Sequence, residues 1–349
     1  MLASLSSNAI LAKARAMYGR RLTKQNYADL LACQTVNEVA YYLKSHTSYA
    51  KVLAGINEND IHRGQLEVML KQKMFEDYSS LCHYELSIGE RFSGYLIAKS
   101  DIELILHSLV FLQAGTSQGN LFLMPMFLNK HTRIDLPALG RIATYEDLLN
   151  ALSRTPYRKL LEPFRPTAGV PLDYTGIENV LYTNLYQNVF EIIRKTTVGE
   201  TSKQLRELFN TYVDLKNYVS ILRMKTYYKT EPDSIRKYLL PFGTIQGRTL
   251  EEMIAAQDEE ELTKLMKKTA VGKHCLKIEH EFIDQVPVRI NYLTSRHDVH
   301  FSIHPTVVMM SYLFIAQTEL SDIVNIIEGI RYKLAPSEIT KLLTIVNFQ

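Results

Sequence analysis

Three histidines in the last quarter of the chain have the residue type and the spacing of a metal site. His297, His300 and His304 occur in one short segment, and on a helix His300 and His304 would share a face with the i, i+4 spacing that zinc sites use. No HExxH pattern accompanies them, the residues between them alternate as in an extended segment, and Pro305 disfavours helix at His304. We therefore expect ordinary surface or loop histidines, and a metal-dependent enzyme that uses them remains a third hypothesis.

Other patterns that could carry chemistry are incomplete. Gly115 with Gly119, and Gly243 with Gly247, have GxxxG spacing, but no Lys-Ser/Thr pair follows either one, so we expect turns and no phosphate-binding loop. A loose cluster at 274–280 contains two histidines and a cysteine, and no GxSxG elbow or nucleophile–histidine signature is present. The sequence therefore predicts no catalytic residue, no cofactor and no metal.

Charge and cysteine usage argue against two further classes of protein. The chain has 349 residues, of which 46% are hydrophobic and 22% charged, as in a globular protein with a sizeable core. Its 40 basic and 37 acidic residues give a net charge of +3, which is too balanced to indicate a nucleic-acid partner. Cys33, Cys82 and Cys275 are odd in number and far apart, without a CxxC motif. We therefore expect neither disulfides nor structural zinc, and a reducing cytosol is the default.

The N-terminal segment is predicted to form an amphipathic helix. Residues 1–21 contain a brief apolar run with no basic region before it, and Lys13 and Arg15 follow, which is atypical of a signal peptide. No stretch of about 18 uncharged apolar residues occurs, so no transmembrane helix is expected. The protein could still dock on a membrane complex.

One sequence pattern occurs three times, in residues 36–53, 144–161 and 258–275. It predicts the helices that would position any functional site. Aligned without gaps, the three segments share an acid, a threonine and a lysine, which recur after 108 and 114 residues. These residues are Glu38, Glu146 and Glu260, then Thr47, Thr155 and Thr269, then Lys51, Lys159 and Lys273. A period of this length is a whole subdomain, so the chain is predicted to contain three copies of one helical unit. Each threonine is interpreted as the N-cap of the next short helix, as Thr155 before Pro156 suggests.

Two further anchors extend the repeat. The stretch Ile177, Leu181, Leu185, Val189 and Ile193 is an i, i+4 stripe of an amphipathic helix. Its counterpart in the first copy consists of Leu66, Met69, Leu70, Met74 and Tyr78, and Glu279 and Phe282 extend the match to the third copy. A closing helix follows at 101–111, 214–225 and 319–333. Its first acid (Asp101, Asp214 or Glu319) is interpreted as a helix-start residue that the macrodipole favours, and the cations at the far end are Arg223, Lys225, Arg331 and Lys333.

Predicted loops mark the boundaries between the three copies. Residues 115–120 and 231–234 are predicted to be linkers, and the proline-containing stretch 163–173 is predicted to be a loop within the second copy. The strand candidate 286–293 is short and isolated. These features favour an all-α protein with one helical repeat in each of 1–120, 121–235 and 236–349.

Together, these features resemble the C subunit of bacterial and archaeal V/A-type ATPases, whose eukaryotic relative is the vacuolar ATPase d subunit. The resemblance covers essentially the whole chain and rests on three segments. Ala14-Arg15-Ala16-Met17 looks like the opening helix of that family. DLKNYVSILRMK, with Asn217, looks like its middle closing helix, and ELSDIVNIIEGI, with Glu319, Asp322 and Glu328, looks like its last one. At Asp322 the family usually carries Asn, which makes an amide contact there doubtful.

The resemblance implies a fold and a role. The fold would be a funnel of three similar helical domains around a pseudo-threefold axis. The protein would be a non-catalytic adaptor on the cytoplasmic side of the membrane, between central-stalk subunits of the D and F type and the rotor ring of c/K-type proteolipids. It would couple rotation to ATP-linked ion transport without a small-molecule substrate. Arg223, Lys225, Arg331 and Lys333 are the predicted partner contacts. The alternative is a generic helical-repeat scaffold that binds other proteins.

Overall fold

The computed structural model describes residues 2–84, 89–115, 124–167, 169–275 and 285–348. Within these ranges the chain is helical and has no strand, which confirms the all-α class, and the strand candidate 286–293 is helical. In chain order the elements are α1 (Leu2–Gly19), α2 (Lys24–Ala32), α3 (Val36–His46), η1 (Glu58–Asp60), α4 (Arg63–Tyr84), α5 (Gly89–Ala114), η4 (Met126–Lys130), α6 (Leu136–Leu139), α7 (Tyr145–Ala151), α8 (Tyr157–Leu161), η5 (Glu162–Phe164), α9 (Tyr174–Thr196), α10 (Gly199–Thr226), α11 (Pro232–Lys237), α12 (Gly247–Ala255), α13 (Glu259–Lys268), α14 (Ala270–Cys275), α15 (Gln285–Phe301), α16 (Pro305–Arg331) and α17 (Pro336–Leu342).

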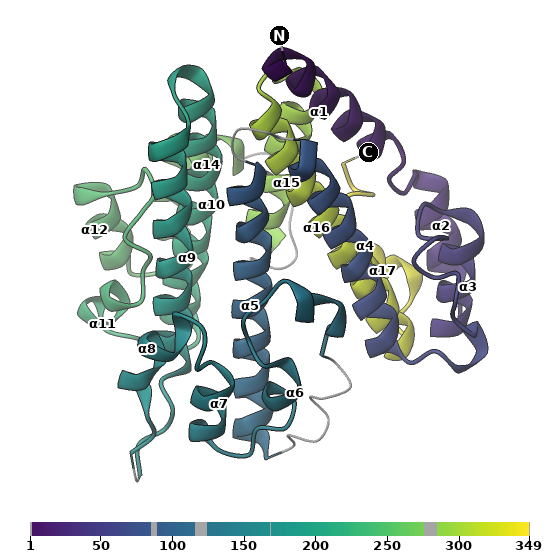
Figure 1. Ribbon diagram of the computed structural model, residues 1–349. Helices are drawn as coiled ribbons and strands as arrows, with labels where there is room; N and C mark the ends of the chain where they lie inside the picture. The colour runs from purple at the N-terminus through teal and green to yellow at the C-terminus, as the bar shows by residue number, and fades with distance from the viewer. Residues whose placement is uncertain (1, 85–88, 116–123, 168, 276–284, 349) are drawn as a thin grey trace.

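Three pairs of long helices form the body of the molecule (Figure 1). The pairs are α4 with α5, α9 with α10, and α15 with α16. Contacts between the pairs run in a cycle, because α5 packs on α9, α10 packs on α15 and α16, and α16 packs on α4. The α9–α10 and α15–α16 turns lie at the same end of the molecule as α1, which packs on α4, α15 and α16 (Figure 1).

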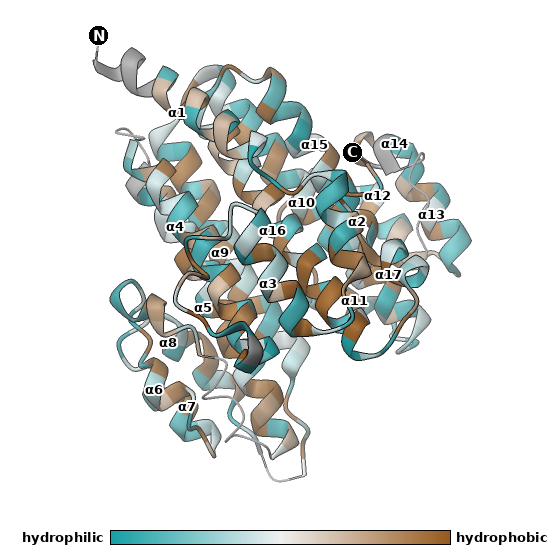
Figure 2. Cartoon of the chain, turned by 90° about the vertical axis from the view of Figure 1, so that its right-hand side faces the viewer, coloured by the Kyte–Doolittle hydropathy of each residue, from teal (hydrophilic) through white to brown (hydrophobic). Residues whose placement is uncertain are grey.

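Helix α16 lies near the middle of the molecule, where other helices surround it (Figure 2). It is apolar on nearly all sides, as expected of a helix inside a core. By length and composition it is the one described helix that could cross a membrane, but 78% of its most apolar stretch is buried within the protein. Its composition is therefore accounted for by packing against α1, α3, α4, α10 and α15.

Three modules of short helices accompany the helix pairs: α2–α3, α6–α8 and α12–α14. In each module one helix begins at a side chain that accepts a hydrogen bond from a backbone N–H in the first turn. Thr35 caps α3, Thr144 caps α7 and Asp258 caps α13. Such caps satisfy backbone groups that a helix leaves unpaired at its start. Each of the three segments thus contains a helix, as predicted.

In the second and third modules, the acid that is structurally equivalent to Glu38 lies one residue after the predicted match. In each module, the third helical residue accepts a hydrogen bond from the backbone just before the helix, as in a capping box. These acceptors are Glu38 with Gln34 N (2.7 Å), Asp147 with Ala143 N (3.1 Å), and Glu261 with Gln257 N (2.7 Å). Glu146 and Glu260 instead form exposed ion pairs with Arg165 and Lys264, each at 2.6 Å. The gapless alignment missed this because the modules differ by a one-residue insertion.

The repeated threonine mainly ends the preceding helix, which corrects its interpretation as an N-cap. The hydroxyls of Thr47, Thr155 and Thr269 donate to carbonyls of the previous helix at 2.6, 2.8 and 2.7 Å. Only Thr269 also caps the next helix, where it accepts from Gly272 N at 2.9 Å. A threonine between two short helices can bond in either direction, and sequence alone does not choose between them.

Other sequence predictions have mixed outcomes. The apolar stripe 177–193 is buried along α9, as expected. The loop predicted at 163–173 is wrong at its start, because residues 163 and 164 belong to η5, and its other described residues are not helical. The linker predicted at 231–234 is wrong, because Pro232 starts α11. Glu279, His280, Phe282 and most of 115–120 lie outside the described residues, as do the side chains of His274 and Cys275.

Candidate partner interface

Buried carboxylates on the closing helices hold the modules in place. Asp214 lies in the middle of α10, with 1% of its surface exposed. One carboxylate oxygen accepts from Thr244 N at 2.9 Å and Thr244 Oγ1 at 2.6 Å, and the other accepts from Ile245 N at 3.0 Å. These residues lead directly into α12. The predicted role of this acid at a helix start is therefore wrong, because it is a buried acceptor for another segment.

Asp322 on α16 makes the same arrangement with the C-terminal segment. It is 1% exposed and accepts from Thr344 N at 2.8 Å and Ile345 N at 2.7 Å. The resembling family usually carries Asn at this position. Here the contacts with the backbone are made by a carboxyl group and not by a side-chain amide. Asp101 on α5 is simpler, since it accepts from the hydroxyl of Thr132 at 2.6 Å.

Glu319 joins the two ends of the described chain. It lies on α16, is buried, and accepts from Leu22 N at 2.8 Å and from the Tyr49 hydroxyl at 2.9 Å. Leu22 leads into α2, so the first module is held by the last closing helix. The second and third modules are held by α5 and α10, the closing helices that precede them.

Burial raises the pKa values of these four acids. It raises the pKa of Asp101 to about 7 and the pKa of Asp322 to about 7. Burial also raises the pKa of Asp214 and of Glu319. In every case the hydrogen bonds to the carboxyl group act in the opposite direction and offset part of the burial cost.

The closing helices also match in a register that the sequence prediction missed. Asp214 corresponds to Asp322, three residues beyond Glu319. Asn217 bonds to Leu240 O at 3.0 Å, and Asn325 bonds to Leu342 O at 3.3 Å, so both amides hold the chain just before the Thr-Ile segment. The signal was present as an Asp-x2-Asn-x5-Arg-x-Lys spacing that occurs twice.

The four predicted contact residues lie at the C-terminal ends of α10 and α16. Lys225 is half-buried and donates to Ala256 O at 2.6 Å, so it ends α12 within the protein. Arg331 is exposed and pairs with Glu328 at 3.1 Å. Arg223 and Lys333 are exposed, and Lys333 has a left-handed backbone with φ 57°. The structure therefore leaves three of the four cations at the surface.

Exposed aromatic side chains accompany these cations. Tyr227 and Tyr228 follow α10 with 74% and 76% of their surface exposed, and Tyr332 follows α16 with 69% exposed. Aromatic residues together with arginine are typical of protein interfaces. The ends of α10 and α16 are thus candidate partner contacts.

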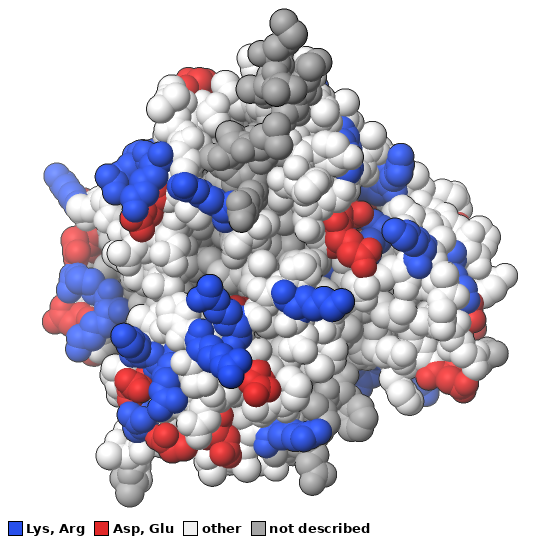
Figure 3. Space-filling view, viewed as in Figure 1, with Lys and Arg blue, Asp and Glu red and all other residues white. Residues whose placement is uncertain are grey.

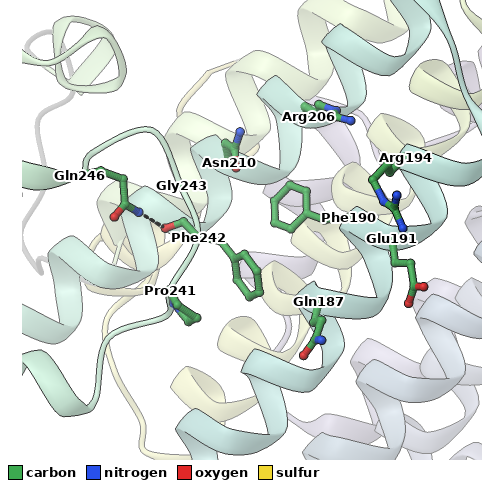
Figure 4. Close-up of a pocket in the computed structure, with 10 residues that line it drawn as sticks. All are labelled: Gln187, Phe190, Glu191, Arg194, Arg206, Asn210, Pro241, Phe242, Gly243 and Gln246. Atoms are coloured by element: carbon green, nitrogen blue, oxygen red, sulfur yellow. Dashed lines mark hydrogen bonds between the residues drawn. The ribbon is translucent and has the colours of Figure 1, made fainter.

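Two of the cavities bordered by described residues are candidate sites for small molecules, and both lie outside these surfaces. A cavity of about 680 Å³ lies between α9, α10 and residues 241–246, where the rings of Phe190 and Phe242 meet at 5.2 Å (Figure 4). Arg194 and Arg206 border it without a hydrogen bond or ion pair to any described residue. A second cavity, of about 480 Å³ between α4, α5 and α16, is lined by internal ion pairs such as Lys71 with Glu67 at 2.9 Å. Neither brings together nucleophile, base and acid.

The histidine segment is split by the fold. His297 and His300 lie on α15, whereas His304 precedes α16 and its ring bonds to Thr201 Oγ1 at 2.8 Å. His300 and His304 therefore do not share one helix face, which the i, i+4 interpretation requires. Among the described residues, no group of three His, Cys, Asp or Glu side chains could hold a metal ion.

Comparison with known proteins gives the family. Residues 10–342 match the family described as ATP synthase (C/AC39) subunit. The chain belongs to this family. Two similar C/AC39 relatives are each named as the C subunit of an A-type ATP synthase. The one from Pyrococcus furiosus is 22% identical over 343 residues, which cover 95% of this chain and 88% of that protein. The one from Methanosphaera stadtmanae is 24% identical over 75% of this chain, and the match spans 65% of that protein's length.

Family membership confirms the resemblance that the sequence motifs indicated, and the structure gives the opening C/AC39 motif a physical role. Arg15 on α1 donates from Nε to Val299 O at 2.9 Å and from Nη2 to Ser302 O at 2.9 Å. A guanidinium at the C-terminus of a helix satisfies carbonyls that have no partner within it. Arg15 thus ties the first helix to the end of α15.

Proposed function

We propose that this protein is the non-catalytic adaptor between the rotating central stalk and the membrane rotor ring of a V/A-type ATPase. The observation that carries the proposal is the exposure of large apolar side chains at both ends of the long helices. Val198 and Phe301 are 86% and 72% exposed at one end, and Tyr227 and Tyr332 are 74% and 69% exposed at the other. Helix α10, with 28 residues, separates the two ends by about 42 Å. An adaptor needs two such separate surfaces.

The three-domain funnel is part of this proposal. Its support is the cycle of contacts among the three helix pairs, together with the seating of each module on a closing helix from another copy. We assign the domains to 1–120, 121–235 and 236–349, and place a pseudo-threefold axis along the helix pairs. Three similar domains would provide a surface that can contact both a symmetric ring and an asymmetric shaft.

Stiffness and surface charge fit the role. A torque transmitter must resist deformation, and closely packed helices have low compressibility. On the face seen in Figure 3, basic and acidic side chains are interspersed, which suits a polar interface that can dissociate. We place the stalk subunits of the D and F type at the end with Arg223, Arg331 and Lys333, and the proteolipid ring at the opposite end. The protein would then lie peripherally on the cytoplasmic face of the membrane.

The first test is capture from detergent-solubilised membranes with the tagged protein. Stalk and ring subunits should both be recovered, and loss of the protein should uncouple ATP hydrolysis from ion transport while hydrolysis by the soluble head continues. Recovery of neither stalk nor ring would contradict the adaptor. Recovery of unrelated proteins alone would favour the generic scaffold.

A surface variant sharpens this test. Arg331→Gln with Lys333→Gln should weaken stalk capture and leave ring capture unchanged, because both cations lie at the proposed stalk end. The matched control is Arg154→Gln with Lys159→Gln, since these two cations are exposed on the second module and lie on neither α10 nor α16. Equal loss of stalk capture in both double variants would place the stalk elsewhere.

A further inference from the structure

A basic pocket lies beside the α15–α16 turn, outside the stalk end described above. It has a volume of about 760 Å³ and is bordered by the α1–α2 connection and the last turns of α15. The basic side chains that line it are Arg21, Lys24, Arg296, His297 and His300. No acidic side chain is among the described residues that line it. The pocket therefore presents uncompensated positive charge.

Contacts with the protein hold these cations in place. Arg21 lies over the ring of Tyr18 at 3.9 Å and donates to Tyr18 O at 3.0 Å, while its buried Nε has no hydrogen-bond partner among the described residues. The Tyr18 ring in turn contacts the ring of His300 edge-on at 5.1 Å. Arg296 donates to Phe348 O. Arg21, Arg296 and His300 are thus held at the pocket by contacts with the protein.

The potential at the pocket is positive. Burial lowers the pKa of His300, and the nearby Arg21, Arg296, Arg15 and His297 lower it further. On the other side of α15, the carboxyl of Asp298 bonds to Ser311 on α16 at 3.3 Å and does not line the pocket. An anion entering the pocket would therefore meet several cations and no carboxylate from the described residues.

Exposed apolar side chains adjoin the pocket at its open end. Phe301, which also lines the pocket, is 72% exposed, and Ile303 is 76% exposed. The α9–α10 turn lies alongside, because Thr201 bonds to His304 at 2.8 Å, and it exposes 86% of Val198. Apolar side chains grouped this way on a surface mark an interaction site.

One acidic side chain near the apolar cluster has a partner. Glu200, two residues after Val198, lies 3.7 Å from Lys203 on the same helix. The apolar side chains therefore adjoin the basic pocket through Phe301, and the charge of the nearby Glu200 is balanced by Lys203. A lipid surface can use both features, because its headgroup phosphates attract the cations and its interfacial layer accepts the apolar side chains.

We propose that this end of the molecule binds an anionic lipid surface, with headgroup phosphates in the basic pocket and with Phe301, Ile303 and Val198 in the interfacial layer. Phosphates pair with arginine and lysine, and the apolar side chains leave water at the headgroup boundary. The inference concerns the end that the adaptor role assigns to the ring, and it goes beyond that role because vesicle binding needs neither stalk nor ring. Vesicle binding can therefore fail while capture of stalk and ring succeeds, and the reverse.

The test is co-flotation of the purified protein with vesicles. Phosphatidylcholine vesicles that contain phosphatidylglycerol should bind the protein, and vesicles of phosphatidylcholine alone should not. Each cation near an anionic surface contributes a factor of about five, so Arg21→Gln with Lys24→Gln should weaken binding by about 25-fold. Binding should also fall as salt is raised, because exposed charges are screened.

Two further variants separate the apolar and structural contributions. Phe301→Ser with Ile303→Ser removes exposed side chains only and should weaken vesicle binding without loss of helical circular dichroism. Tyr227→Ser with Tyr228→Ser makes the same kind of change at the far end and should leave binding unchanged. Equal binding to both vesicle types, or equal loss in both serine pairs, would overturn the proposal. Binding to soluble polyglutamate but not to vesicles would assign the pocket to an acidic protein segment and would also overturn it.

Discussion

Replacing Asp322 by asparagine should flatten the pH dependence of stability. Burial raises the pKa of Asp322 to about 7 from an ordinary value of 3.8, so the folded protein keeps this proton over a range where the unfolded chain has lost it. The folded state is therefore favoured at low pH, and this contribution is lost as the pH rises toward the folded value. Between about pH 5 and 7 the loss is about 1.4 kcal/mol per unit, or roughly 3 kcal/mol in total. The amide side chain of the Asp322→Asn variant does not titrate, so it cannot contribute this pH dependence.

The assay is urea unfolding followed by circular dichroism at a series of pH values. A matched control is Asn217→Ala, because Asn217 is also buried and bonds to the backbone of Leu240 at 2.9 and 3.0 Å, but it does not titrate. The control should lower the free energy of unfolding by about 2 kcal/mol at every pH, the cost of orphaned backbone groups. Wild-type protein and Asp322→Asn with the same pH dependence would refute the inference that this carboxyl group ionises within the core.

Three further predictions concern backbone and side-chain contacts. Gly243→Ala should lower the melting temperature, because φ is +103° and a Cβ would overlap Asp214 Oδ1, whereas Gly19→Ala, with open space around it, should not. Arg15→Gln should speed hydrogen exchange at the α15–α16 turn, and unchanged exchange would contradict the capping role. Glu319→Gln should destabilise the protein by about 2 kcal/mol and selectively expose the α2–α3 module to proteolysis, whereas uniform cleavage would argue against a local latch.

Helical periodicity made the architecture predictable from sequence. The stripe from Ile177 to Ile193 is buried as expected, and the closing segments are helical. The pairing of the long helices was harder to predict from sequence, because it depends on which apolar faces pack against each other. Linker prediction failed at 231–234, since proline starts short helices as readily as it interrupts long ones.

The functional contacts were harder to predict for a physical reason. Sequence position alone suggested that Asp101, Asp214 and Glu319 begin helices, yet they lie well inside α5, α10 and α16. A buried acid cannot be recognised without its partner, and Glu319 finds its partner 297 residues away at Leu22. Lys225 likewise looked like a surface cation, and only the fold shows that it is held by Ala256 O.

The bond between Glu319 and Leu22 also has a consequence for folding. The cycle of helix pairs closes only when residues from opposite ends of the sequence meet, and the Leu22–Glu319 contact spans nearly the whole chain. Contacts of such high sequence separation slow folding, because loop-closure entropy must be overcome before they form. During synthesis, Leu22 N and the Tyr49 hydroxyl must remain without their acceptor until α16 has been made. Deleting any one copy would therefore be expected to leave a buried carboxylate unpaired on a neighbouring copy, and the three units would persist or fail together.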